Sequence, residues 1–330
     1  MNAISEVNLK ETIEIYLKKR HNTTLSLLDK PIFLLIDEVH YDKDWDLHVK
    51  LLYDKSPNLF LLLSGSSSLQ LDFNADVARR LKVHEISPLN YSQHLKLKYG
   101  YNTTISNDLI DLLFEGNVEK AQKHEFKVHN DLINLNNYDY NDWDFYFKYG
   151  GFCSVLNKKY LVDVTSELWT IVSKIIKNDI TPTFNLSNKT QDVVYRVLVL
   201  ISSQKPGEIS QNKVAGNLGN STSTINNVFN ILEQTRVIFH YQAYGSSETQ
   251  SRKSWKYYIA TSSLKNGINM NFGHTIINER DYDGILLENL VASSLFNLRN
   301  KLMYCPDKGF NIFYDKNSGG SDFIIQRQFQ

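Results

Sequence analysis

The apolar run Ile32–Ile36, followed directly by Asp37 and Glu38, constrains the fold of this chain more than any other stretch. A short continuous apolar run is typical of a strand buried on both faces of a parallel sheet. Ligands of such sheets bind just beyond the carboxyl ends of the strands. The run therefore predicts a buried strand that presents two carboxylates at a ligand-binding edge. From these residues alone, a buried strand that ends in two solvated acids remains the alternative.

A second apolar run, Leu59–Leu63, leads into Ser64. The intervening segment, Trp45–Asp54, has apolar residues at helical spacing. Strand, helix and strand form a βαβ unit, in which the crossover is right-handed and the strands are parallel. We therefore expect Ser64 to lie beside Asp37 and Glu38 at one edge of the sheet.

In order and spacing, these motifs resemble the prokaryotic AAA-type P-loop ATPases, whose core precedes a winged helix and a C-terminal nuclease-like domain of unknown function. The resemblance runs from about residue 28 to the C-terminus and rests on Ile36–Val39, Trp45, Leu51–Asp54, Ser64–Ser67, Arg80, Pro88-Leu89, Tyr149–Phe152 and Leu287–Val291.

The resemblance implies a role for each residue at the sheet edge. Asp37 would hold the Mg²⁺ of ATP, Glu38 would polarise the attacking water and Ser64 would act as sensor of the γ-phosphate. Arg80 would be an arginine finger that acts on a neighbouring subunit, which requires a homo-oligomer. An ordinary surface arginine is the alternative for Arg80. The implied cofactors are ATP and Mg²⁺.

The phosphate-binding loop is where the chain departs from this family. That loop needs Gly-x-x-x-x-Gly-Lys-Ser/Thr, because backbone N–H groups cradle the phosphates and the lysine reaches them. None of the fifteen glycines is followed by lysine, and the first of them is Gly65. Asn8–Arg20 instead predicts a short charged helix. The resemblance then implies that the loop is missing through truncation, gene splitting or decay, and we expect the isolated chain to be inactive as an ATPase.

Residues 186–264 predict a winged helix. Two short helices, Gln211–Leu218 and Thr222–Thr235, flank a turn at Gly219-Asn220, which is the helix-turn-helix arrangement. Ser210 and Ser221 are the expected N-caps. Val237–Tyr244 and Trp255–Ala260 would form the strands of the wing.

This region carries the candidate DNA contacts. The side chains expected to reach bases or phosphates are Thr222, Ser223, Asn226 and Asn227 on the second helix and Arg252 and Lys253 at the tip of the wing. Residues 186–264 hold eight Lys or Arg and four Asp or Glu, a net charge of about +4. Winged helices also contact proteins, so a protein partner remains the alternative to DNA.

The C-terminal region, residues 265–330, predicts a truncated nuclease-like domain. It combines a helix, Ile285–Leu298, with strands at Phe310–Tyr314 and Ser321–Ile325. By resemblance Glu288 and Asp322 remain from the acidic set, but Gly320 stands where the family has its first acid. Clustered carboxylates are needed to bind the metal of such nucleases, so we do not expect a working nuclease.

The remaining residues complete the predicted organisation. Lys82–Ile86 alternates loosely like a strand, and residues 91–185 predict a helical lid-like region with one long amphipathic helix at Leu161–Ile176. The fold class is α/β, namely an incomplete AAA-type parallel sheet with helices (1–90) and a lid-like region (91–185), then a winged helix (186–264) and a partial α+β nuclease-like domain (265–330).

Composition sets limits on the function. Lys plus Arg and Asp plus Glu both total 36, so no global field favours nucleic acid or membrane. No apolar run approaches the ~20 residues of a membrane span, which predicts a soluble cytoplasmic protein without a membrane partner. Two functions stay open, namely an AAA-type ATPase associated with DNA, and a non-enzymatic adaptor that binds DNA or protein through residues 186–264.

Overall fold

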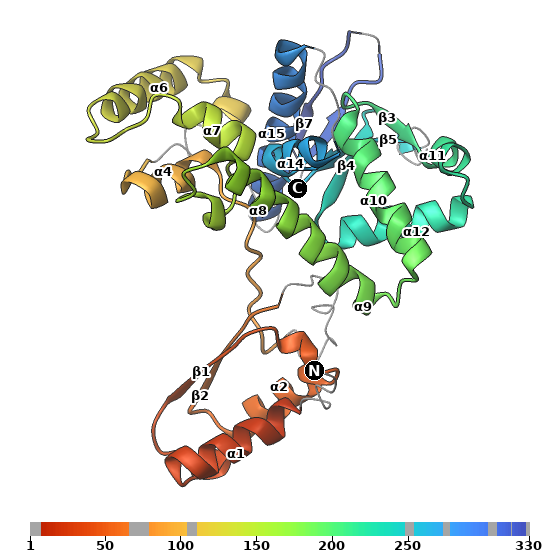
Figure 1. Cartoon of the computed structure of the whole chain (residues 1–330). Helices are drawn as coiled ribbons and strands as arrows, with labels where there is room; N and C mark the ends of the chain where they lie inside the picture. The colour runs from red at the N-terminus through yellow and green to blue at the C-terminus, as the bar shows by residue number, and fades with distance from the viewer. Residues whose placement is uncertain are drawn as a thin grey trace. The chain divides into compact units, whose positions relative to one another are not determined.

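The computed structural model describes residues 8–65, 79–103, 111–247, 254–272, 278–302, 309–317 and 319–327 (Figure 1). It is mixed helix and sheet, in agreement with the α/β prediction. The chain divides into two compact units, residues 1–86 and residues 87–330, and each is described here by itself.

The first unit contains the predicted βαβ element. Its described residues form α1 (Leu9–His21), η1 (Leu25–Leu27), β1 (Ile32–Ile36), η2 (Val39–Tyr41), α2 (Trp45–Lys55) and β2 (Leu59–Leu63). The two strands pair in parallel, with Ile32 opposite Leu59 and Ile36 opposite Leu63. The prediction of adjacent parallel strands is therefore confirmed. Asn8 caps α1 by accepting a hydrogen bond from the N–H of Glu11 at 2.9 Å.

The prediction that β1 is buried on both faces is wrong. Ile32, Leu34 and Ile36 pack against a core made largely by α1 and α2, which includes Leu17 and Leu52. The alternate residues of both strands face solvent instead, with Phe33 69% and Leu35 76% exposed. The reason is that both helices pack on the same face of this two-stranded sheet.

A second strand prediction in this region is also wrong. The described residues 81–90 form neither helix nor strand, although Lys82–Ile86 alternates like a strand. Val83 and Ile86 are exposed, so the alternation has no sheet face to bury. A period of two predicts a strand only where a neighbouring strand and a core are present.

The second unit begins with helices and ends with a sheet. Its helical part comprises α4 (Tyr91–Tyr99), α6 (Val118–Ile133), α7 (Asp142–Tyr149), η3 (Cys153–Val155), α8 (Leu161–Lys174), the π-helical η4 (Ile175–Ile180), α9 (Thr181–Thr183) and α10 (Asn188–Ser203). The long amphipathic helix predicted at Leu161–Ile176 is confirmed and continues through η4. Two segments that carry the family resemblance, Pro88-Leu89 and Tyr149–Phe152, are in contact. The N–H of Leu89 donates to the carbonyl of Gly151 at 2.8 Å.

The elements after α10 contain the predicted helix pair and its strands. They are β3 (Glu208–Ser210), α11 (Gln211–Leu218), α12 (Thr222–Gln234), β4 (Ile238–Ala243), β5 (Ser254–Ile259), α14 (Ser262–Asn271), α15 (Glu279–Leu302), β6 (Phe310–Tyr314) and β7 (Ile324–Arg327). Both helices begin as predicted, and Ser221 caps α12 by accepting from the N–H of Thr224 at 3.1 Å. Ser210 occupies the N-cap position of α11, but its side chain makes no capping bond there.

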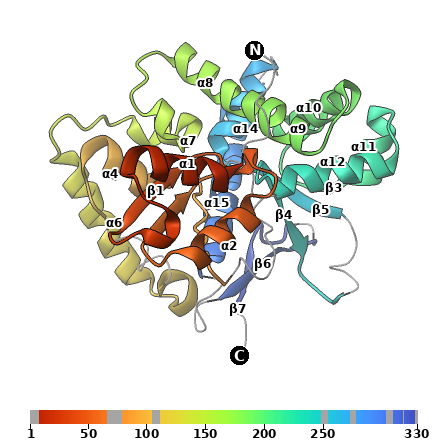
Figure 2. The same cartoon turned by 90° about the horizontal axis from the view of Figure 1, so that it is seen from below.

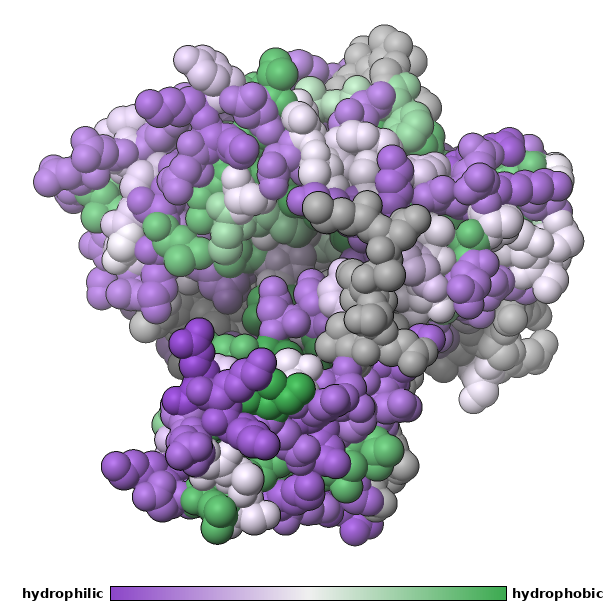
Figure 3. All heavy atoms as spheres, turned by 60° about the horizontal axis from the view of Figure 1, so that its bottom comes forward, coloured by the Kyte–Doolittle hydropathy of each residue, from purple (hydrophilic) through white to green (hydrophobic). Residues whose placement is uncertain are grey.

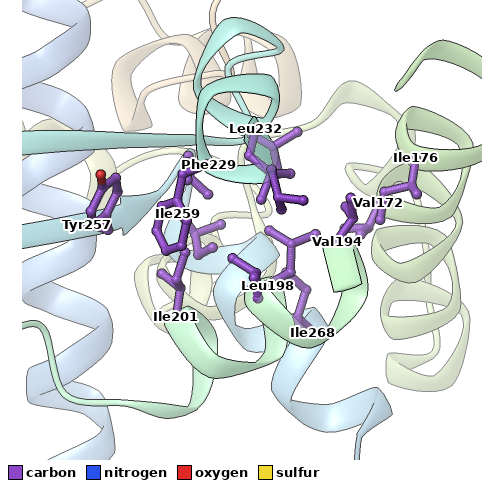
Figure 4. Close-up of a cluster of buried hydrophobic side chains, with 14 of the residues drawn as sticks. Val172, Ile176, Val194, Leu198, Ile201, Phe229, Leu232, Tyr257, Ile259 and Ile268 are labelled. Atoms are coloured by element: carbon purple, nitrogen blue, oxygen red, sulfur yellow. The ribbon is translucent and has the colours of Figure 1, made fainter. Parts of the chain in front are cut away.

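A five-stranded sheet forms the centre of the second unit, within its described residues. The strand order is β3-β5-β4-β6-β7, with β4 and β6 parallel and the other pairs antiparallel. Ile238 and Ile259 belong to the core that contains α10 and α12. Figure 4 shows Ile259 in this core. Phe239 and Tyr241 belong to a second core, with α15 and β6. The sheet therefore continues past residue 264, and the strands predicted as a wing share it with the C-terminal strands.

The helix α14 packs against α7, α8 and α10 and also contacts β5 of the sheet. Its place among these elements is seen in Figure 2. Residues 262–269 are all buried, although most of them are polar. Lys265 donates to the carbonyl of Ile201 at 2.8 Å, and Asn266 donates to the carbonyl of Lys148 at 2.9 Å. Those carbonyls lie at the C-terminal ends of α10 and α7, where helices leave acceptors without intrahelical partners. The helix is therefore buried because its side chains satisfy these helix ends.

The surface in view in Figure 3 is mostly hydrophilic, with small apolar groups between. Among the helices of the described residues, none combines the length and apolar character that crossing a bilayer requires.

Candidate functional site

Asp37 and Ser64 meet at the carboxyl edge of the first unit's sheet. The Ser64 hydroxyl donates a hydrogen bond to the Asp37 carboxylate. The N–H of Ser64 donates to the carbonyl of Ile36, and the N–H of Val39 donates to the carbonyl of Ser64, both at 2.9 Å. Asp37 is exposed, so its second oxygen can reach a ligand from solvent. The sequence predicted this juxtaposition, and the parallel register produces it.

Glu38 adjoins this pair through its backbone. Its N–H donates to Ser64 Oγ at 3.4 Å, and its φ and ψ of 52° and 51° place it in the left-handed region. A non-glycine residue with positive φ is uncommon and costs free energy. Glu38 joins the end of β1 to η2, which begins at the next residue.

Arg80 is not brought to the Asp37–Ser64 pair within the chain. Its guanidinium makes a bidentate ion pair with Asp54, at 2.8 and 3.1 Å. Asp54 lies near the end of α2, which runs back along the sheet from its carboxyl edge over 11 residues. At a rise of about 1.5 Å per residue, the nine steps from Trp45 carry Asp54 roughly 14 Å away from that edge. The finger role of Arg80 stays a prediction, and it would require the pair with Asp54 to open.

Asp42 is a buried acid that the sequence analysis did not single out. Its carboxylate accepts from the N–H of Leu9 at 2.7 Å, from the N–H of Asp44 at 2.9 Å and from His48 Nδ1 at 2.6 Å. It thereby fixes the start of α1 beside the loop that follows β1. The bond to Leu9 spans 33 residues, and no local pattern could have predicted it.

The proposed DNA-contacting helix, α12, has a polar exposed side. Thr222, Ser223 and Asn227 are exposed, as predicted. Asn226 differs from the prediction that it faces outward, because it is half-buried and its Oδ1 is buried without a hydrogen-bond partner among the described residues. It follows Ile225 and precedes Val228 by two positions, and both of these are core residues. Arg252 and Lys253 lie outside the described residues.

A second polar cluster lies at the edge of the larger sheet. Lys256 of β5 approaches Asp322 at 3.0 Å and Glu288 of α15 at 3.6 Å, and the Tyr258 hydroxyl donates to Glu288 at 3.0 Å. Burial raises the pKa of the Glu288 carboxyl, and the positive charge of Lys256 opposes that rise. The cluster borders a pocket of about 270 Å³, which Glu208 and Tyr314 also line.

This second cluster unites the two acids that the sequence analysis assigned to the nuclease-like region. No local pattern could have predicted the role of Lys256, since its contact with Asp322 spans 66 residues. The next residue of α15, Asn289, is fully buried and pairs its amide with both the N–H and the carbonyl of Ile259, at 3.0 and 2.8 Å. Within the segment Leu287–Val291, Asn289 thus holds α15 against β5. Within the part of the chain that the structure describes, no three His, Cys, Asp or Glu side chains gather as a metal-ligand group.

Comparisons with known proteins bear on the first unit. Residues 2–95 match the family described as an AAA domain. This match supports an AAA-type family for the N-terminal part of the chain, where the parallel strands and the Asp37–Ser64 pair lie.

A second family match lies in the second unit. Residues 140–273 match a domain of unknown function, DUF8612, which spans α7 to α14.

An uncharacterized protein of Methanocaldococcus jannaschii is a relative of this chain. It is 28% identical over 301 residues, which are 91% of this chain and 60% of the relative. The chain therefore spans less than two thirds of the length of that relative.

Among solved structures, a MepR mutant from a multidrug-resistant S. aureus clinical isolate is similar at 16% identity. The similarity covers 44% of this chain and 99% of the MepR chain with a TM-score of 0.20. A likeness at that TM-score carries no weight for fold or function.

Proposed function

We propose that the first unit is the metal-holding half of an AAA-type Mg·ATP site. The observation that carries this proposal is the parallel register of β1 and β2, which sets the Asp37 carboxylate against the Ser64 hydroxyl at the carboxyl edge. Ligands of parallel sheets bind at that edge. The match of residues 2–95 to an AAA domain supports the same assignment.

The residues at this edge fit a magnesium ion. Carboxylate and hydroxyl oxygens are the hard ligands that Mg²⁺ prefers. When bound, the ion would neutralise the charge of the phosphates. Asp37 would hold it, Ser64 would keep the carboxylate oriented through its hydrogen bond, and Glu38 would supply the carboxylate that polarises water.

This half-site should bind nucleotide weakly in the chain as given. None of the fifteen glycines is followed by lysine, so these residues offer no Gly-Lys phosphate cradle. We expect calorimetric titration with Mg·ATP to give a dissociation constant weaker than about 10 μM, or about −6.8 kcal/mol. Any weak binding that requires Mg²⁺ should disappear in Asp37→Asn and persist in Asp44→Asn, an exposed acid of the same unit.

Two outcomes would contradict this proposal. Nucleotide binding tighter than about 10 μM would show that the phosphate grip is present without the usual loop. Weak binding that survives Asp37→Asn unchanged would place the metal elsewhere.

A second function, DNA contact through α12, is favoured by the exposed polar side of that helix. Thr222, Ser223 and Asn227 are exposed at its start and on its outer side. The helix has no Lys or Arg between residues 222 and 234, so its own contacts would be to base edges or neutral hydrogen bonds to phosphate. Phosphate attraction would come from Arg252 and Lys253, by the sequence interpretation.

Salt dependence separates these two kinds of contact. In fluorescence binding to duplex DNA, Arg252→Ala with Lys253→Ala should flatten the slope of log K against log salt by about 2. Asn227→Ala should alter sequence preference and leave that slope almost unchanged. If the wild-type chain shows no DNA affinity at low salt, the region is a protein-contact module and the adaptor alternative holds without nucleic acid.

A further inference from the structure

The segment Lys82–Ile86 connects the two compact units, since the first unit ends at residue 86 and the second begins at residue 87. It forms neither helix nor strand, and its residues lie outside the hydrophobic cores of both units. Exposed loops are common at protein surfaces. This one differs because the chain is held firmly both directly before it and shortly after it.

The chain before the segment is fixed to the first unit. The Arg80 guanidinium makes its bidentate ion pair with Asp54 of α2, at 2.8 and 3.1 Å. A bidentate, charge-assisted pair fixes the orientation of the arginine as well as its position. Leu81 packs against the core of the first unit, which contains Leu17 and Leu52. Residues 80 and 81 therefore move with α2 as one body.

The chain after the segment is fixed to the second unit through both backbone groups of Leu89. Its N–H donates to the carbonyl of Gly151 at 2.8 Å, and its carbonyl accepts from the hydroxyl of Tyr146 in α7 at 2.9 Å. The next residue, Asn90, begins α4 with a capping box to Gln93, whose two hydrogen bonds measure 2.8 and 2.9 Å. The contact between Pro88-Leu89 and Tyr149–Phe152 thus serves as an anchor for the start of the second unit.

We propose that Lys82–Ile86 is a hinge about which the first unit changes its orientation relative to the second. In hinge motions, a few loop residues between two rigid bodies absorb the change in φ and ψ. These five residues lie between the fixed points at Leu81 and Leu89. Pro88 has a fixed φ and restricts Ser87 to extended conformations, so the rotation is confined to the residues before them.

The hinge does not depend on the Mg·ATP role proposed for the first unit. Relative motion is the ordinary behaviour of two compact units that one segment of chain joins. The candidate edge belongs wholly to the first unit, so a rotation at the hinge would carry Asp37 and Ser64 together and leave their hydrogen bond intact.

Pulsed electron paramagnetic resonance, which measures distances between spin labels, tests this proposal in the full chain after both native cysteines are changed to serine. One pair of labels joins the units, at Glu11→Cys on α1 and Asn230→Cys on α12. The control pair lies within the second unit, at Ser166→Cys on α8 and Asn230→Cys, on helices that share one core. We expect the distances of the first pair to be spread at least about twice as widely as those of the control.

A proline variant tests whether the motion arises in this segment. His84→Pro with Ile86→Pro fixes φ at two positions and restricts the residue before each of them. It should narrow the spread of the inter-unit distances towards that of the control pair. The matched variant is His84→Ala with Ile86→Ala, which removes the same side chains without fixing φ and should leave the spread unchanged.

Any of three results would overturn the proposal. An inter-unit spread as narrow as that of the control pair means that the two units form one rigid body. A spread that the proline variant leaves unchanged places the motion outside Lys82–Ile86. A spread that narrows equally in the alanine variant depends on the side chains rather than on the freedom of the backbone. Circular dichroism confirms that each labelled protein is folded before its distances are compared.

Discussion

Glu38 lies at the candidate edge with a backbone conformation that is unfavourable for a glutamate. Its positive φ of 52° suits glycine or asparagine better than glutamate. Backbone strain of this kind clusters at functional sites, although Arg236, in another part of the chain, also has positive φ. The N–H of Glu38 contacts Ser64 Oγ, so the backbone of this residue belongs to the candidate edge.

Replacing Glu38 tests whether its backbone conformation is strained. Both Glu38→Gly and Glu38→Ala remove the carboxylate, but only glycine adopts the left-handed conformation without strain. We expect Glu38→Gly to be about 0.5–1 kcal/mol more stable than Glu38→Ala in urea unfolding, since relief of about 1–2 kcal/mol is partly offset by the entropy of glycine. Equal stabilities would show that the turn does not hold residue 38 at positive φ in solution.

At the scale of elements, α14 acts as the support of the second unit. Lys265 is 2% exposed, and its Nζ donates to the carbonyls of Ile201 and Gln204 at 2.8 and 3.2 Å. Gly267 allows a close crossing with α8, because a Cβ there would lie 2.9 Å from Cβ of Leu168. Burial lowers the pKa of the Lys265 amine to about 7, and the negative charge of Glu288 opposes this.

That pKa makes stability depend on pH in a defined direction. Between pH 7 and the ordinary lysine pKa, the unfolded chain binds a proton that the folded chain does not, so the free energy of unfolding rises with pH. We expect the wild type to gain about 2 kcal/mol between pH 7 and 9 relative to Lys265→Met, measured by urea unfolding at both pH values. Parallel pH dependence in the two proteins would show that Lys265 keeps its ordinary pKa. Lys189→Met, on an exposed lysine of α10, is the matched control and should behave like the wild type.

Elements with a strong local signal were predictable from the sequence, and their contacts were not. The apolar stripe of α12 and its Ser221 cap fixed that helix to within a residue. The alternation over Lys82–Ile86 led to a wrong strand prediction, because a strand also needs a neighbouring strand that local sequence does not reveal. At the candidate edge, Asp37 and Ser64 follow from two apolar runs and one crossover, whereas Asp42 and Lys256 act through contacts 33 and 66 residues away.

At the scale of the whole molecule, the second unit has one sheet with a core on each face. The strands β4 and β5 supply Ile238 and Ile259 to one core and Phe239 and Tyr258 to the other. Removing the residues after 264 would strip α15, β6 and β7 from the second core. Since Phe239, Tyr241 and Tyr258 are at most 5% exposed in the chain, that face would become a large apolar surface.

The helix pair should therefore fail to fold alone. We expect a fragment of residues 186–264 to aggregate or remain unfolded, while residues 87–330, which form one compact unit, unfold in a single cooperative transition. Circular dichroism with thermal and urea unfolding of both fragments provides the measurement. A soluble 186–264 fragment with a cooperative transition of its own would contradict this prediction, because it would show that the predicted winged helix is energetically independent of the C-terminal strands. Conversely, two separate transitions within 87–330 would mean that the shared sheet does not couple its two cores.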